Sequence, residues 1–198
     1  MKQKIITSNF YSIREPIEVS FEASKEKLYG DDWIVQIGNF RLLKVLLLYG
    51  SNGSGKTNIL LALDFLQEVI INIPQNVGDK FDYMPFAFDT MEKEKPTVFF
   101  MAIKNNWLVI LDEFGAGMQA RTQHLLLDFF LKMSRRSQLI FATQSLGFLD
   151  FPKMRRDSLL IISKDKIGQS KVDAHTIRNI HKKYQIKKGL HRWAFYIN

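Results

Sequence analysis

The sequence predicts an α/β fold in which a mostly parallel central sheet is covered by helices and is joined by an N-terminal antiparallel β flap. Apolar runs typical of buried parallel strands lie at 42–49, 107–111, 138–142 and 158–163. Helix-like stretches lie at 57–71 and around 124–133, where apolar residues recur at helical spacing. Residues 4–49 hold several short β-like runs separated by Gly30, Gly38 and charged turns, which favours an antiparallel flap.

A glycine-rich loop connects the first of these strands to the first helix. It reads GSNGSGKT from Gly50 to Thr57, the spacing of a phosphate-binding P-loop. Glycines let the backbone aim successive N–H groups at phosphate oxygens, and the following helix adds its positive N-terminal end. Lys56 would reach the β- and γ-phosphates, and the Thr57 hydroxyl would bind Mg²⁺. The sequence thus predicts a three-layer P-loop NTPase whose nucleotide-binding residues are Gly50, Ser51, Asn52, Gly53, Ser54, Gly55, Lys56, Thr57 and Asn58.

A second apolar run ends in two acidic residues. Trp107 to Leu111 is unbroken in its apolar character and is followed by Asp112 and Glu113, as in a buried parallel strand that delivers carboxylates at its C-terminal end. Ligands of parallel α/β sheets bind at that end of the strands. We therefore expect Asp112 to bind Mg²⁺ and Glu113 to polarise the attacking water as general base. The combination predicts an ATPase with ATP and Mg²⁺ as cofactors.

Four segments resemble a known group of ATPases. The loop GSNGSGKTN, the run LVILDEFGAGMQ, the opening SNFYSIRE and the strand QLIFATQSLGFLD are similar to the ATP-binding-cassette-type heads of the prokaryotic AAA/OLD-like group. That group is related to structural-maintenance-of-chromosomes ATPases, and many members serve in abortive infection and other anti-phage systems. The resemblance implies a head that forms a homodimer or higher assembly in a defence or DNA-maintenance complex, with a toxin or nuclease effector as partner.

The resemblance also implies roles for single positions. Gly50 to Thr57 resemble the Walker A loop, and Asp112 and Glu113 resemble the Walker B pair. Gly115 to Gln119 resemble the D-loop that crosses to a second subunit. Gln144 stands where the group usually has a switch histidine that senses the γ-phosphate. Glutamine still forms hydrogen bonds but carries no positive charge, so the implied catalytic contact at Gln144 is altered.

One part of such a head has no counterpart in this sequence. The heads close over ATP with a serine/glycine signature motif from a second subunit, and no such motif lies between Asn58 and Trp107. Three explanations are open: the helical arm that carries the motif has been lost, a partner supplies the cap, or the loop was never long. We expect one ABC-type head domain over residues 1–198, with an N-lobe at 1–103, a C-lobe at 104–198 and the arm absent between them.

Composition limits the function classes further. With 198 residues and 46% hydrophobic content, the chain is long enough for one well-buried α/β domain. It contains no cysteine, which excludes a disulfide framework and a thiolate zinc site. Its apolar runs are far shorter than the roughly 20 residues that span a bilayer, and the N-terminus lacks the apolar core of a signal peptide. We expect a cytoplasmic protein without a membrane partner.

Positive charge is concentrated towards the C-terminal end. Residues 151–198 carry the whole positive excess behind the net charge of +8, because they hold 12 Lys/Arg against three acids, whereas residues 1–150 hold 16 basic and 17 acidic side chains. Within this quarter, residues 178–193 interleave basic side chains with Tyr184 and Trp193, which fits a nucleic-acid backbone with stacked bases. A solvated helix face or a surface for an acidic protein partner fits the same charges.

The second predicted helix carries an apolar stripe at helical spacing: Leu125, Leu126, Phe129, Phe130 and Met133. Such a stripe predicts packing against the core rather than a cofactor site. Three functions stay open at this point. The chain is an ATPase whose output is the association of two heads, a nucleotide-binding module with little turnover, or a scaffold that docks an effector protein.

Overall fold

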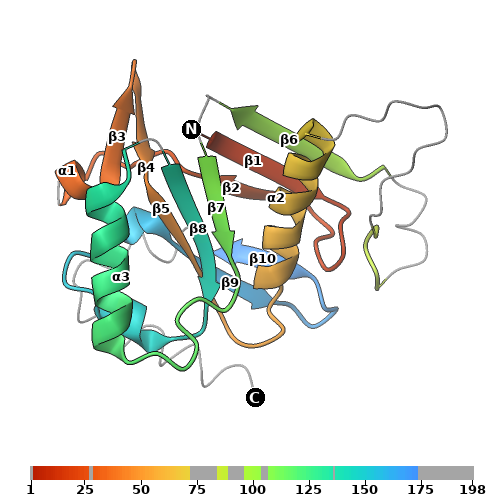
Figure 1. Cartoon of the computed structure of the whole chain (residues 1–198). Helices are drawn as coiled ribbons and strands as arrows, with labels where there is room; N and C mark the ends of the chain where they lie inside the picture. Colours follow the sequence, from red (N-terminus) through yellow and green to blue (C-terminus); the bar gives the residue numbers. More distant parts are fainter. Residues whose placement is uncertain are drawn as a thin grey trace.

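Five strands form the central sheet of the computed structural model: β10 (Ser170–Asp173), β9 (Leu159–Lys164), β5 (Val45–Tyr49), β8 (Ser137–Thr143) and β7 (Trp107–Leu111), in that spatial order (Figure 1). β9, β5, β8 and β7 are parallel, and β10 pairs antiparallel with β9 at one edge. The structure describes residues 2–26, 29–71, 84–88, 96–103, 107–135 and 137–173. The predicted mostly parallel sheet is confirmed.

The parallel strands owe their position to their apolar sequences. β5 reads VLLLY and β8 reads SQLIFAT, and almost every residue of both is buried. Side chains on both faces of such a strand need cover, because successive residues point to opposite sides of the sheet. These two strands therefore lie in the interior of the sheet, with β5 between β8 and β9.

A separate antiparallel sheet forms the predicted flap. β1 (Lys2–Ser8) lies between β2 (Ile17–Ser20) and β6 (Val98–Ile103), with Ile5 opposite both Val19 and Met101. The sheet thus combines the N-terminus with a strand from far along the chain. A hairpin of β3 (Ile34–Ile37) and β4 (Phe40–Leu43) follows the short helix α1 (Gly30–Trp33) and turns at Gly38, whose φ of +57° suits glycine.

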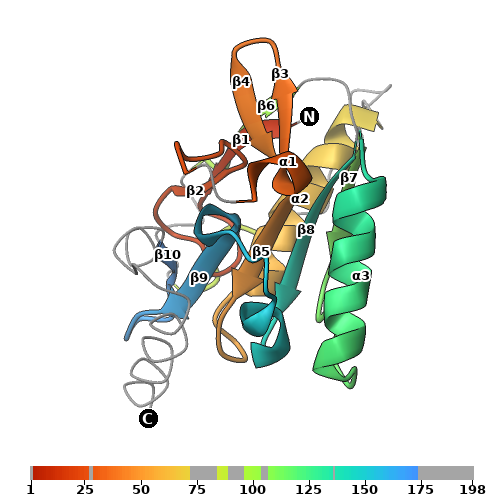
Figure 2. The ribbon, with the colours of Figure 1, turned by 90° about the vertical axis from the view of Figure 1, so that its left-hand side faces the viewer.

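Two long helices cover the central sheet from opposite faces, which gives the predicted three layers (Figures 1 and 2). α2 (Lys56–Ile71) packs between the central sheet and the antiparallel flap, where its leucines join Ile5 and Val19 in one apolar core. α3 (Ala120–Met133) covers the other face together with the short 3-10 helix η2 (Leu146–Asp150). A second 3-10 helix, η3 (Arg156–Ser158), leads into β9. No helix in the described ranges is long and apolar enough to cross a membrane.

The predicted core stripe of α3 is wrong. The buried residues of this helix are Gln123, Leu127 and Leu131, whereas most of the predicted stripe is exposed, with exposed fractions of 63% for Leu125 and 63% for Phe129. Only Phe130, which is partly buried, packs against the core of this face. The helix turns its 123–127–131 face to the sheet, because Leu127 and Leu131 pack in the core there and Gln123 bonds to the buried Gly115 carbonyl beside it. The helical periodicity of the sequence predicted that α3 has an apolar face. It did not predict that the sheet covers a different face of the helix.

Candidate nucleotide-binding site

The P-loop lies between the C-terminal end of β5 and the first turn of α2. Its backbone adopts left-handed conformations at Gly53 (φ +72°) and Gly55 (φ +98°), which L residues with side chains rarely adopt. At Gly55 a Cβ atom would also collide with the Ser170 hydroxyl. Glycine is therefore required at position 55 for two separate reasons.

The loop has the features of an anion cradle. The backbone N–H groups of Gly55, Lys56 and Thr57 have no acceptor among the described residues. They belong to the start of α2, where the helix dipole favours negative charge. N–H groups without an acceptor at a helix N-terminus are the kind of donors that bind phosphate oxygens.

Lys56 supplies the positive charge of the cradle. Its Nζ atom donates to Gly50 O at 2.9 Å and to Ser51 O at 2.8 Å, and the residue is only 9% exposed. Burial lowers the pKa of Lys56, and the nearby carboxylates of Asp112 and Glu113 oppose that shift. The Lys56 ammonium group is therefore close enough to Asp112 and Glu113 to interact with both carboxylates electrostatically.

Thr57, in the first turn of α2, contacts Asp112, which follows β7. Thr57 Oγ1 donates to Asp112 Oδ2 at 2.7 Å. β7, which delivers Asp112, is not the neighbour of β5, because β8 lies between them. The contact is made above the end of β8, at the C-terminal edge of the sheet. A hydroxyl and a carboxylate oxygen are ligands that Mg²⁺ prefers, so this pair fits the predicted metal position.

Glu113 lies beside the pair in a strained backbone conformation. Its φ is +48°, which is unusual for a residue other than glycine, and such a conformation costs on the order of 1–3 kcal/mol. The Glu113 N–H donates to Asp112 Oδ1 at 2.9 Å, which orients the neighbouring carboxylate. The Glu113 side chain is exposed to solvent.

Gln144 follows β8 directly and is exposed. Since β8 lies between β5 and β7, its C-terminal end lies between the P-loop and the Asp112–Glu113 pair. The next residues are fixed, because Ser145 N–H donates to Thr143 Oγ1 and Ser145 Oγ caps η2 at Gly147 N–H. The fold therefore presents the Gln144 position to the same edge as the other predicted site residues.

A buried polar cluster beneath the P-loop has no signal in the sequence. Ser170 Oγ donates to Ser54 O at 3.0 Å, and it also lies 2.7 Å from Ser12 Oγ. Asn58 Nδ2, from the first turn of α2, donates to Ser12 Oγ at 2.6 Å. Asn58, a predicted nucleotide-binding residue, thus places its side-chain amide on this cluster. Serines and asparagines are too common for sequence alone to connect positions so far apart.

Gln123 is a second polar residue that the sequence analysis missed. Its Nε2 atom donates to Gly115 O at 2.8 Å and to Met118 O at 3.1 Å, and its Oε1 atom accepts from Ser145 Oγ at 3.0 Å. The side chain thereby connects α3 with the loop after Glu113 and with the turn after Gln144. The only sequence pattern that could have indicated this role is the helical spacing of four residues that places Gln123 on the same side of the helix as Leu127 and Leu131.

Two predicted features differ in how far the structure describes them. The loop Gly115 to Gln119 follows the Asp112–Glu113 pair, with Gly115 buried and residues 116–119 exposed. The basic segment 178–193 lies outside the described residues.

Comparison with known proteins adds one match. Residues 45–99 match the model of a family described as "AAA domain, putative AbiEii toxin, Type IV TA system". The matched segment contains β5, the P-loop and α2, and it ends within β6, before Asp112. No curated protein matches the chain. Over its P-loop segment the chain is therefore similar to P-loop ATPases of the AAA type, a class of nucleotide-binding proteins.

Proposed function

We propose that the chain binds ATP with Mg²⁺ and hydrolyses it. The observation that carries this proposal is the 2.7 Å contact between Thr57 Oγ1 and Asp112 Oδ2, which joins the two predicted motifs beside the Lys56 ammonium group. Mg²⁺ held there neutralises charge on the β- and γ-phosphates. Lys56 and the N–H groups of the loop bind the phosphates.

Glu113 acts as the general base in this proposal. It follows the metal-binding carboxylate directly, and its side chain is exposed at the edge where the γ-phosphate would lie. A carboxylate there accepts a proton from water as the water attacks. Gln144 orients the γ-phosphate or the water through its amide, without the charge that a histidine would add.

The second candidate is a nucleotide-binding module with little turnover, which serves as a scaffold for an effector protein. Neutral Gln144 favours it, because a γ-phosphate contact without charge stabilises the transition state less. The exposed apolar side chains of α3 favour a docked partner.

Association of two heads is part of the leading proposal. The exposed loop after Glu113, residues 116–119, lies beside the site and supports contact with a second subunit there. A role in phage defence or DNA maintenance, a toxin or nuclease effector, a nucleic-acid contact through 178–193 and a cytoplasmic location complete the proposal and rest on the sequence.

Calorimetry with Mg-ATP and a phosphate-release assay test the two functions on the same variants. Lys56→Ala removes a charged hydrogen bond to phosphate, so ATP affinity should fall at least about tenfold. Glu113→Gln should leave affinity unchanged and lower hydrolysis by about 10²- to 10⁴-fold. Lys166→Ala, which removes an exposed lysine from the turn between β9 and β10, is the matched control and should change neither quantity.

The outcomes separate the candidates. Unchanged ATP affinity in Lys56→Ala would reject the phosphate site itself. Tight binding with equal background turnover in wild type and Glu113→Gln would reject the ATPase and support the binding module. Faster turnover in Gln144→His would show that the neutral side chain limits the wild-type rate.

A further inference from the structure

Two of the proposed site residues lie on short segments that follow neighbouring strands. Glu113 follows Asp112 at the end of β7 and leads into the loop 114–119, and Gln144 follows β8 and leads into η2. Because β7 and β8 pair in parallel, both segments leave the C-terminal edge of the sheet beside each other. The side chains of Glu113 and Gln144 are exposed. Their positions therefore depend on the backbone of the segments that carry them.

The side-chain amide of Gln123 contacts the backbone segments that follow both residues. Gln123 is only 2% exposed. Its Nε2 atom donates at 2.8 Å to the carbonyl of Gly115, which lies two residues after Glu113. Its Oε1 atom accepts at 3.0 Å from the hydroxyl of Ser145, which directly follows Gln144. Since one planar amide group makes both hydrogen bonds, it sets the distance between the two segments.

Two glycines leave room for this amide group. At Gly147 a Cβ atom would collide with Gln123 Oε1. At Gly115 a Cβ atom would lie 3.0 Å from Gln123 Nε2 and 2.6 Å from the ring of Phe148, and the φ of +83° there also suits glycine. Both segments thus approach the amide more closely than residues with side chains would allow.

Neighbouring contacts join the same segments. The ring of Phe114 stacks on that of Phe148 in η2, with centroids 5.4 Å apart, and the Phe114 N–H donates to Ala142 O at 3.0 Å. His124, near the start of α3, donates from Nε2 to Gly147 O at 2.7 Å. The amide of Gln123 therefore lies in a packed junction between α3 and the ends of two strands.

We propose that Gln123 is a positioning residue for the proposed ATP hydrolysis, on which this inference rests. Gln123 acts through the backbone of the two segments and sets the Glu113 carboxylate and the Gln144 amide relative to each other. A misplacement of about 1 Å around the reacting atoms lowers a rate by up to about 100-fold. Loss of the amide should therefore lower kcat, whereas phosphate binding by Lys56 and the P-loop stays unchanged.

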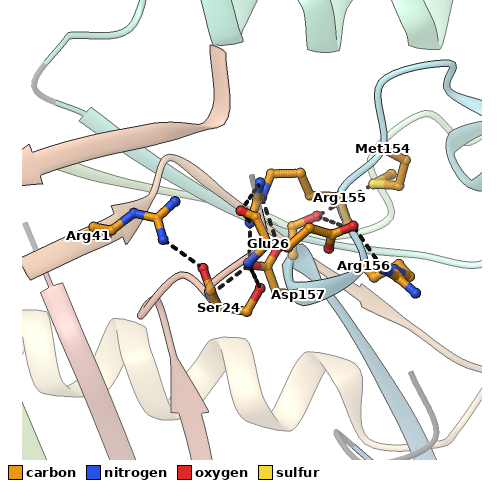
Figure 3. Close-up of polar contacts among 8 residues, drawn as sticks. Ser24, Glu26, Arg41, Met154, Arg155, Arg156 and Asp157 are labelled. Carbon is orange, nitrogen blue, oxygen red and sulfur yellow. Dashed lines mark hydrogen bonds and ion pairs between the residues drawn. The ribbon is translucent and has the colours of Figure 1, made fainter. Parts of the chain in front are cut away.

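A second buried polar network supplies matched controls (Figure 3). Arg155 is 1% exposed and binds both carboxylate oxygens of Asp157, at 3.0 and 2.7 Å, and the hydroxyl of Ser24 donates to Asp157 Oδ2 at 2.8 Å. Asp157 lies just before β9, at the edge where the parallel strands begin, whereas the nucleotide site lies at the edge where they end. Changes in this network should alter stability without moving the site.

The first experiment compares Gln123→Met with Arg155→Met, because both variants replace a buried polar side chain with an unbranched apolar one. Phosphate release at saturating Mg-ATP gives kcat, and calorimetry gives ATP affinity, at a temperature where circular dichroism shows each variant to be folded. Gln123→Met should lower kcat at least about tenfold and leave ATP affinity within about twofold. Arg155→Met should change neither quantity, and Ser24→Ala replaces it as the control if it does not fold.

A double-mutant cycle then tests the path through Ser145. Ser145→Ala removes the hydroxyl that binds the Gln123 amide, and Ser24→Ala removes a hydroxyl from the other network. The loss of kcat in Gln123→Met with Ser145→Ala should be at least about threefold smaller than the product of the single losses, because the two residues share one contact. Gln123→Met with Ser24→Ala should give the full product.

Hydrogen exchange without nucleotide measures the link between the segments directly. The amides of Ala116 and Met118 bond within the first segment, and those of Ser145 and Gly147 bond within the second. Gln123→Met should speed exchange at least about threefold in both segments, because both lose the same anchor. Arg155→Met should leave these amides unchanged.

Each readout has a result that overturns the proposal. An equal kcat loss in Gln123→Met and Arg155→Met would mean that Gln123 serves stability alone. A full product of losses in the cycle with Ser145→Ala, or faster exchange in one segment only, would remove the link between the segments. A wild-type protein without turnover would reject the proposed hydrolysis instead, since exchange tests the link without ATP.

Discussion

The two long helices cover opposite faces of one sheet, but they are buried to very different extents. On α2, Ile59, Leu60, Ala62, Leu63 and Leu66 are all buried, because the central sheet covers one side and the antiparallel flap covers another (Figure 1). On α3 only Gln123, Leu127 and Leu131 are buried, and no third layer covers its outer face within the described chain (Figure 2). An apolar helix surface thus shows that a face of the helix could be buried. It does not show whether the described part of this chain covers that face.

The largest expected difference concerns leucines of the two helices. Leu63→Ala on α2 should lower the free energy of unfolding by about 2–5 kcal/mol, because Leu63 is 1% exposed and its loss leaves a cavity. Leu125→Ala on α3 is the matched control, and at 63% exposure it should change stability by less than about 0.5 kcal/mol. Urea unfolding measures both values. A comparable loss for Leu125→Ala would mean that the outer face of α3 is covered in solution.

An intermediate effect is expected at Gln123, the buried polar residue of α3. Gln123→Ala removes the Nε2 donor of the Gly115 and Met118 carbonyls and the Oε1 acceptor of Ser145 Oγ, and the loss of these hydrogen bonds should cost about 1–3 kcal/mol in total. Gln119→Ala is the control, since the Gln119 side chain makes no capping hydrogen bond to the helix. If chemical denaturation gave equal midpoints for the two variants, the anchoring role of Gln123 would be refuted.

The smallest effect is expected from an ion pair on α3. The hydrogen bond from Lys132, four residues along the helix, lowers the pKa of Asp128, and Lys153 adds to that shift while burial opposes it. A carboxyl whose folded pKa lies below its unfolded value adds stability above the unfolded pKa, and this stability is lost as the pH falls through the folded pKa. Asp128→Asn should therefore cost at most about 1 kcal/mol at pH 7 and nothing at the acid end of the titration.

Stability curves of wild type and Asp128→Asn against pH check this prediction. The two curves should begin to approach each other near the unfolded pKa of about 3.9 and coincide once the pH lies below the folded pKa of Asp128. Asp64→Asn on α2 is the control, because no described residue forms an ion pair with Asp64. A difference for Asp128→Asn that grows towards acid pH would have the wrong sign for a lowered pKa.

The sequence predicted those elements whose signals are local. The P-loop follows from its glycine spacing, and the structure places its strand and helix at Val45–Tyr49 and Lys56–Ile71. The strand before Asp112 follows from its continuous apolar character. Both signals are strong because a close backbone turn and burial on both faces each restrict the residue types allowed.

The features that the sequence could not supply depend on contacts between distant residues. The outer face of α3 was predicted to lie in the core. Periodicity shows which residues share one side of the helix, but it does not show which side faces the sheet. The insertion of β8 between β5 and β7 depends on pairing, and the same strands in another order would look alike. Gln123 was missed because a buried polar side chain is recognised by its partners, which lie on other segments.

The serine cluster beneath the P-loop bears on the order in which the protein is made. Ser54 lies in the loop, but Ser170, which bonds to its carbonyl, is 116 positions further along the chain. Ribosomes add roughly 5–20 residues per second, so the loop waits seconds for this partner. Until β10 has been synthesised, the nascent chain lacks the Ser170 hydroxyl, so the carbonyl of Ser54 gains this hydrogen bond only when that late strand docks.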